Sequence, residues 1–111
     1  MMNYRKPKRD LTKWDTIKGE MLLEAFSIAE QNSLMKLLLD DLLSDRDFNQ
    51  LAARIYAMHL IFRGTPYSHI QNETGLSSKT IARVSKKMDQ KDGGFDQIMR
   101  KLYPRGYRYF D

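Results

Sequence analysis

The chain has 111 residues and a mass of 13.1 kDa, which is the size of one small domain. It has no cysteine, which excludes disulfide bonds and thiolate metal sites, and no stretch approaches the roughly 18–20 apolar residues that a membrane-spanning helix needs. The N-terminus is charged and no apolar segment follows it, so we expect no signal peptide, a cytoplasmic location and no membrane partner.

The net charge of +5 is unevenly distributed along the chain. Residues 15–50 hold eight acidic and three basic residues, whereas residues 77–91 hold five basic residues and one acidic residue. The positive field is therefore centred on residues 77–91, which is typical of a protein that binds a polyanion through one surface.

Residues 1–13 contain five lysine and arginine residues, one proline and little apolar content, so we expect a flexible basic tail. Two interpretations of this tail are open. It is either a solubilising terminus or an arm that adds phosphate contacts or enters a minor groove of DNA.

Residues 14–103 are predicted to form a single all-helical domain, which begins with two helices. From Trp14 to Ala29 apolar residues recur at helical spacing and form a broad apolar face. Asn32 and Ser33 interrupt this pattern, and a short leucine-rich helix follows, with Ser33 as its N-cap. Because this apolar face is broad, we expect other elements to pack against it on two sides.

A longer helix is predicted next. Ser44 and Asp47 have the spacing of a capping box at its start, and Gly64 marks its end. His59 lies near the apolar stripe of this helix, so we expect it to be packed. The stripe keeps strict alternating spacings of three and four residues and consists of Phe48, Leu51, Ile55, Met58 and Phe62.

Residues 66–88 have the spacing of a helix-turn-helix. Thr65 and Pro66 suit the N-cap and first position of its first helix, since proline loses nothing where the N–H has no partner within the helix. Ile70 falls where the two helices meet. Gly75 falls at the turn position that needs a left-handed backbone, which glycine adopts without a steric penalty.

The second helix of this motif combines a buried stripe with a cationic outer face. Ser77 is a fitting N-cap, and the stripe is predicted to be Ile81, Val84 and Met88. The hydroxyl and cationic groups on the outside suit base edges and phosphates. The candidate DNA-binding residues are Ser77, Ser78, Lys79, Thr80, Arg83, Lys86 and Lys87, with His69 on the first helix near a backbone phosphate.

Both features of the motif have a plainer interpretation. Any two short amphipathic helices joined through a glycine imitate the pattern, and a basic helix face is usually solvated surface. Gln71 also departs from the common pattern, because the position next to the first helix's core residue often holds a small side chain.

After Met88, the polar segment 89–94 ends in two glycines and predicts a break. A last helix is predicted from Asp96 to Tyr103, where Pro104 stops it. The C-terminal tail, residues 104–111, mixes arginine with aromatic residues. It is a packed tail, a partner contact or a disordered end, and we favour packing.

No constellation of residues points to catalysis. His59 and His69 are the only histidines, and neither pairs with a nucleophile at helical spacing. The acidic residues between Asp40 and Asp47 cluster around a helix boundary, where charge at a helix N-terminus and solvation explain them. We therefore expect neither an enzyme nor a metal site.

The block from Ser33 to Phe95 resembles the Trp-repressor superfamily, and especially its shorter YerC/YecD-like branch. The resemblance implies an all-α, helix-turn-helix fold of Trp-repressor type, with about six helices in an intertwined dimer. An intertwined dimer agrees with the two-sided apolar face of the N-terminal helices. The matching motifs are LLLDDLL, SDRDFNQLAARI, FRG, TGLSSKTIARV and the trailing GGF.

In the Trp repressor, tryptophan lies between two arginines and sets the spacing between the two helix-turn-helix units that read the DNA. The resemblance places Arg54 and Arg83 at those two positions, as possible effector-binding residues. Arg54 has an alternative role in an ion pair or a phosphate contact. The repressor has glycine after the second arginine, whereas this chain has Val84, so we expect no cofactor and doubt that tryptophan binds.

The sequence therefore predicts a homodimeric transcription regulator, acting as a repressor, that binds specific double-stranded DNA through its helix-turn-helix. Its two reading helices would lie about 34 Å apart and read an approximate palindrome. The alternative is a helical module that binds protein or RNA and keeps the scaffold without duplex-DNA specificity.

Overall fold

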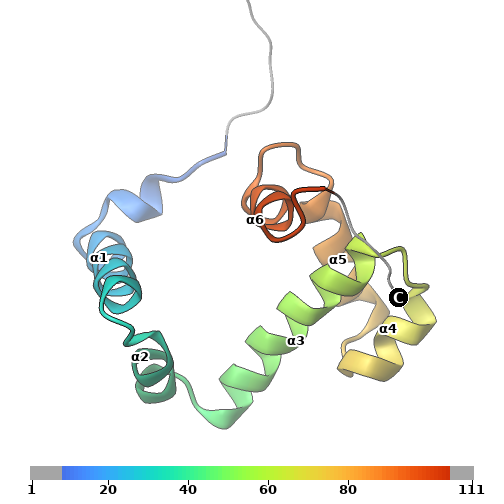
Figure 1. Cartoon of the computed structure of the whole chain (residues 1–111), viewed down its shortest axis with the longest axis horizontal. Helices are drawn as coiled ribbons and strands as arrows, with labels where there is room; N and C mark the ends of the chain where they lie inside the picture. Colours follow the sequence, from blue (N-terminus) through green and yellow to red (C-terminus); the bar gives the residue numbers. More distant parts are fainter. Residues whose placement is uncertain (1–8, 106–111) are drawn as a thin grey trace, which may run out of the picture. The chain divides into compact units, whose positions relative to one another are not determined.

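The computed structural model describes residues 9–105, and over this range it contains six α-helices, a short 3-10 helix and no strand (Figure 1). The all-α fold with about six helices is thereby confirmed. The chain divides between Ser44 and Asp45 into two compact units, which are described separately below. The single domain predicted over residues 14–103 stays a prediction, and most of both predicted tails lies outside the described residues.

The first unit begins with a 3-10 helix, η1 (Thr12–Asp15), followed by α1 (Ile17–Gln31). Trp14 was expected at the start of the α-helix but lies in η1. The reason is a cap, because Thr16 is extended and its hydroxyl accepts a hydrogen bond of 3.1 Å from the N–H of Gly19. Gly19 permits the close approach of η1, since a Cβ there would lie 2.5 Å from the carbonyl oxygen of Lys13.

The end of α1 determines where α2 (Met35–Leu42) begins. The expectation that Ser33 caps α2 is wrong. Ser33 has φ +58° and occupies the left-handed position that closes α1, with the Leu34 N–H donating to the Ala29 carbonyl at 2.7 Å. Because Ser33 belongs to this closing turn, Leu34 takes the N-cap position of α2, with φ −107° and ψ 7° and without a side-chain capping hydrogen bond.

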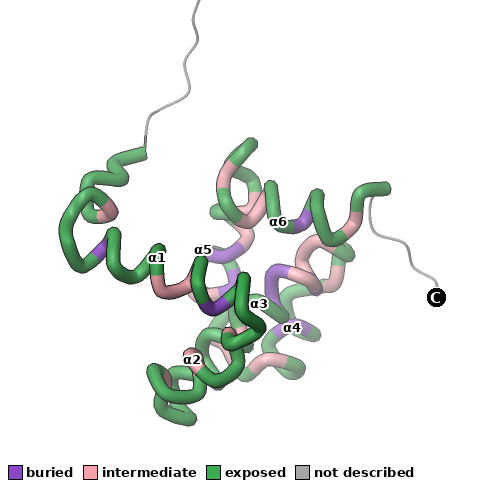
Figure 2. Tube along the Cα trace, turned by 60° about the vertical axis from the view of Figure 1, so that its left-hand side comes forward, coloured by how far each residue is buried: buried purple, intermediate pink, exposed green. Residues whose placement is uncertain are grey.

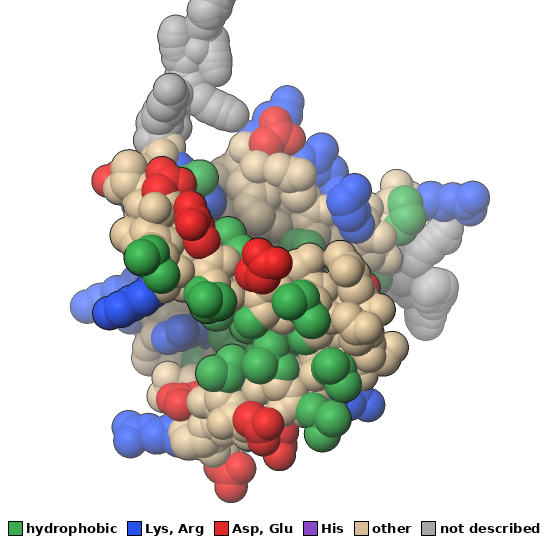
Figure 3. Space-filling view, turned by 90° about the vertical axis from the view of Figure 1, so that its left-hand side faces the viewer, with side chains coloured by type: hydrophobic (Ala, Val, Ile, Leu, Met, Phe, Trp, Pro, Cys, Tyr) green, Lys and Arg blue, Asp and Glu red, His purple; other side chains and the backbone are tan. Residues whose placement is uncertain are grey.

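The apolar face predicted for the first unit is largely uncovered. Only Gly19 and Ala29 are buried in α1, and α2 has no buried residue. Ile17 is 81% exposed, and Met21 and Leu37 are each 64% exposed. Figure 3 views the side of α1 and α2 and shows several hydrophobic side chains on this face.

The second unit packs three shorter helices around the C-terminal half of α3 (Asp45–Phe62). These helices are α4 (Tyr67–Thr74), α5 (Ser78–Met88) and α6 (Gly94–Leu102). Figure 2 shows buried positions along them. One core cluster joins α3 to α4 and α5, and a second joins α3 to α5 and α6. The first cluster consists of Ala57, Leu60, Ile70 and Ile81. The second consists of Met58, Val84 and Met99.

The apolar stripe of α3 extends beyond this core. Met58 is buried and Phe62 is partly buried, as the stripe predicts. Phe48, Leu51 and Ile55 lie in the N-terminal half of the helix and are 57%, 46% and 51% exposed. Periodicity identified an apolar side of the helix, but it did not show which part of that side another element covers.

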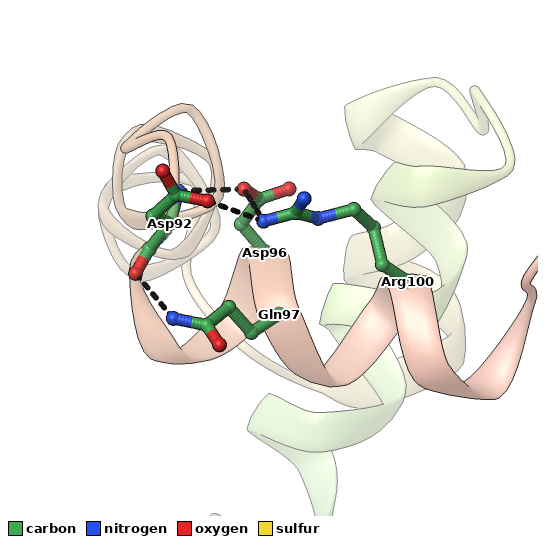
Figure 4. A network of polar contacts seen from close by, with 4 residues as sticks. All are labelled: Asp92, Asp96, Gln97 and Arg100. Atoms are coloured by element: carbon green, nitrogen blue, oxygen red, sulfur yellow. Dashed lines mark hydrogen bonds and ion pairs between the residues drawn. The ribbon is translucent and has the colours of Figure 1, made fainter.

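The loop between α5 and α6 is closed by a polar network (Figure 4). Asp92 has φ +62°, and its N–H donates to Asp96 Oδ2 at 2.7 Å. Arg100 Nη2 donates to Asp92 Oδ1 at 2.6 Å and to Asp96 Oδ2 at 3.0 Å. The hydrogen bond to Asp92 is the largest cause that raises the pKa of Arg100 above its ordinary value. Gln97 Nε2 completes the network by donating to the Asp92 carbonyl at 2.7 Å.

This network accounts for a difference at the start of α6, which begins at Gly94, two residues before the predicted Asp96. Asp96 occupies the first turn of α6 and reaches back to the preceding loop, as acidic residues in capping boxes do.

Among the described helices, none is both long and apolar enough to cross a bilayer.

Candidate nucleic-acid interface

The first helix of the predicted motif, α4, begins one residue later than expected. Pro66 is the N-cap, with ψ 147°, and Tyr67 is the first helical residue, so the roles predicted for Thr65 and Pro66 are wrong by one position. The Pro66 carbonyl accepts hydrogen bonds of 3.1 Å from the N–H groups of His69 and Ile70. Proline is tolerated at this position because an N-cap residue needs no N–H for the helix.

The turn between α4 and α5 has the predicted geometry. Gly75 is left-handed, with φ +73°, and its N–H donates to the Gln71 carbonyl at 2.9 Å. Thr74 Oγ1 donates to the Ile70 carbonyl at 2.7 Å and accepts from the Leu76 N–H at 3.2 Å. Leu76 then packs against the core, while Gln71 is exposed and leaves the helix contact undisturbed.

Ser77 starts α5 as predicted. Its backbone is extended, and its Oγ accepts a hydrogen bond of 3.1 Å from the Thr80 N–H. The same hydroxyl donates to Thr80 Oγ1, also at 3.1 Å. Both hydroxyls are thus engaged in the cap in this structure, and the contacts to DNA predicted for Ser77 and Thr80 stay predictions.

The inner face of α5 is the predicted stripe. Ile81 is fully buried against α3 and α4, and Val84 is 5% exposed against Met58 and Met99. Met88 is partly buried and packs against the same second cluster. Because these side chains pack against three other helices, α3, α4 and α6, they fix the position of α5 within the second unit.

The outer face of α5 carries four exposed cations and no acidic residue. None of these cations forms an ion pair with any residue between 9 and 105. The charge is therefore directed to solvent, with no carboxylate of residues 9–105 in an ion pair with it. We call this surface the cationic face, and it consists of Lys79, Arg83, Lys86 and Lys87, with Ser78 exposed at the helix start.

The two histidines differ in their surroundings. His69 lies on the exposed side of α4, with Nε2 3.9 Å from Glu73 Oε2, a contact that is ionic only when the imidazole is protonated. His59 is partly buried, as expected, and its Nδ1 lies 2.7 Å from the Tyr103 hydroxyl. Among residues 9–105, no group of three or more histidine and carboxylate side chains is placed to hold a metal ion.

Tyr103 is a residue whose role the sequence did not reveal. It follows α6, contacts His59 and stacks on Phe62, with ring centroids 5.4 Å apart. These contacts tie the end of α6 to α3, the helix on which α5 packs. The pairing joins residues 44 apart in sequence, so neither periodicity nor a local motif indicates it.

The two arginines assigned by resemblance to an effector are both exposed. Arg54 lies one turn before Met58 on α3, and Arg83 immediately precedes Val84 on α5. Met58 and Val84 belong to one buried cluster, so each arginine lies within one helical turn, along its own helix, of a residue in the filled contact between α3 and α5. Arg54 forms no ion pair with another residue between 9 and 105, and the roles predicted for it stay predictions.

Comparison with known families gives one finding. The family model described as "Trp repressor protein" matches residues 18–103, which include nearly all of α1 and the whole of α2 to α6. No curated protein and no solved structure gives a match.

Proposed function

The chain belongs to the Trp repressor family, a family of transcription regulators and not of enzymes, and from this premise we propose that it is a sequence-specific regulator that binds double-stranded DNA as a homodimer. The observation that carries the proposal is the cationic face of α5, whose four cations have no carboxylate partner among the described residues. This face lies on the second helix of a capped helix-turn-helix, which is the helix that such motifs insert into the major groove.

The position of each cation along α5 suggests its role. The N-terminal residues of a recognition helix contact base edges, which favours Lys79 for that task, and Arg83 follows four residues later on the same cationic face. A guanidinium at position 83 can bind guanine through two hydrogen bonds, which contributes about 1–3 kcal/mol of discrimination. Lys86 and Lys87 lie in the last turn and suit phosphates, whose contacts are independent of sequence.

The exposed apolar residues support the homodimer. Large apolar side chains are uncovered on α1, α2 and the N-terminal half of α3, and extensive exposure of this kind marks protein interaction surfaces. A second copy would cover them and would place two reading helices about 34 Å apart on an approximate palindrome. The repressor role and the YerC/YecD-like branch belong to the same proposal and rest on the sequence motifs.

Duplex binding by variants of the cationic face tests the proposal. We expect Lys79→Ala and Arg83→Ala to weaken binding of fluorescently labelled duplex DNA, measured by anisotropy over a salt series. Each lost phosphate contact should lower the slope of log affinity against log salt by about 1. Lys101→Ala removes one exposed cation from α6 and is the matched control, for which we expect wild-type affinity.

The same titrations distinguish the alternative module. Tighter binding of single-stranded RNA than of duplex DNA would contradict the proposal, as would equal duplex affinity for wild type, Lys79→Ala and Arg83→Ala. Circular dichroism and the molar mass of each variant show whether a loss of binding comes from a loss of fold or assembly.

A further inference from the structure

The family implies a small-molecule ligand, tryptophan, between α3 and α5, and the packing of these two helices determines whether this chain has room for it. The resemblance assigns Arg54 and Arg83 to the flanks of such a ligand. Because these arginines adjoin Met58 and Val84, a ligand held by both would lie over the contact between those two apolar side chains.

That contact is filled by the chain itself. Val84 is 5% exposed, and Met58 and Met99 are each 1% exposed. Ile61, Phe62 and Met88 pack against the same cluster. An indole ring is large and buries about 150–250 Å² of surface. A close-packed protein interior has no void that would admit a ring of this size. The ring would therefore have to displace a side chain of the core.

A glycine at position 84 would leave the inner side of α5 without a side chain at this point. Valine instead supplies two methyl groups, and these are stiff because a β-branched side chain has one strongly preferred rotamer in a helix. Val84 is the α5 member of the buried cluster that joins α3, α5 and α6, so it helps to fix the position of the reading helix within the second unit.

We propose that Val84 replaces the effector, so that α5 is held in its DNA-binding position by the core and DNA binding is independent of tryptophan. This inference rests on the proposed function for its DNA-binding part, whereas the absence of a tryptophan site stands on the packing alone. Arg54 and Arg83 are then available to DNA instead of a ligand carboxylate.

Calorimetric titration of tryptophan into the full wild-type chain, without DNA, tests the packing directly. We expect no saturable heat at millimolar tryptophan and no change in the melting temperature. Saturable binding in the micromolar range would overturn the inference. This measurement uses no DNA, so its result does not depend on the proposed function.

Val84→Gly and Val84→Ala test whether this side chain is the obstacle. We expect tryptophan to raise the melting temperature of Val84→Gly and to leave that of the wild type unchanged. Val84→Ala retains helix propensity and serves if glycine prevents folding, as judged by circular dichroism. If tryptophan leaves the melting temperature of a folded Val84→Gly, or of Val84→Ala in its place, unchanged, the role assigned to Val84 is wrong. If neither variant folds, the titration of the wild type decides.

Duplex binding with and without tryptophan separates this inference from the proposed function. We expect the same affinity of the wild-type chain in both conditions. An increase of tenfold or more on adding tryptophan would overturn the inference and leave the proposed function standing. An absence of duplex binding in both conditions would contradict the proposed function, and the titration without DNA would still decide whether tryptophan binds.

Discussion

Ser77 controls the first turn of the proposed reading helix. Its hydroxyl accepts from the Thr80 N–H, one of the N–H groups that has no partner within the helix. Replacing an N-cap serine by alanine costs about 1 kcal/mol. We therefore expect Ser77→Ala to lower the free energy of unfolding by about 1 kcal/mol, measured by urea denaturation.

Ser78→Ala is the matched control for this prediction. Ser78 is the first helical residue and is exposed, and no side-chain hydrogen bond within residues 9–105 involves it. We expect its substitution to change the free energy of unfolding by less than about 0.5 kcal/mol. Equal losses for the two serines would show that the cap does not stabilise the domain.

The residue scale also shows which parts of the candidate site follow from sequence. Gly75 and Ser77 were predicted because each performs a local task, a left-handed turn and a cap, that few residue types perform. Ser33 was misassigned because the end of α1 and the start of α2 compete for the same residues, and the closing turn of α1 determines the backbone there. The pairing of Tyr103 with His59 is not local and has no sequence signal.

At the scale of the elements, α6 is anchored by the carboxylate of Asp96. This residue lies in the first turn of α6 and accepts from the Asp92 N–H in the preceding loop. A negative charge at a helix N-terminus is favourable, and losing a capping hydrogen bond costs about 1 kcal/mol. We expect Asp96→Ala to lower the free energy of unfolding by about this amount and to speed amide exchange in residues 89–93.

Asp89→Ala provides the contrast. Asp89 is the C-cap of α5, where a negative charge meets the negative end of the helix dipole. We expect this substitution to be neutral or slightly stabilising. A larger loss for Asp89→Ala than for Asp96→Ala would contradict the role given to the network of Asp92, Asp96 and Arg100.

The sequence predicted the order and type of the helices better than it predicted which of their residues are buried. Spacings of three and four residues identified the apolar side of α3, because that spacing is set by helix geometry alone. The same pattern did not distinguish the buried Met58 from the exposed Leu51 and Ile55. Burial depends on what packs against the helix, and the core of one chain covers only its C-terminal half.

At the scale of the molecule, the uncovered half of α3 tests the proposed homodimer. Leu51 and Ile55 are 46% and 51% exposed, so a charge at either position costs little in a monomer. Buried against a second copy, the same charge would be unpaired and costly. We expect Leu51→Glu and Ile55→Glu to convert the protein from dimer to monomer, measured by light scattering coupled to size exclusion.

Gln71→Glu introduces the same charge on α4, the first helix of the proposed DNA-binding motif, where Gln71 is exposed. We expect this control to remain a dimer. A monomeric wild type, or dimers of unchanged stability in both α3 variants, would refute the assembly. Circular dichroism confirms that each variant keeps its helices.

The most direct test of the account is selection of genomic duplex fragments by the purified full chain at near-physiological salt, without tryptophan, beside Arg83→Ala and Lys101→Ala. The account predicts that wild type and Lys101→Ala recover the same approximate palindrome, with half-sites about one helical turn apart, and that Arg83→Ala does not. Recovery of no common motif by the wild type, or of the same motif by Arg83→Ala, would contradict sequence-specific binding through the cationic face of α5.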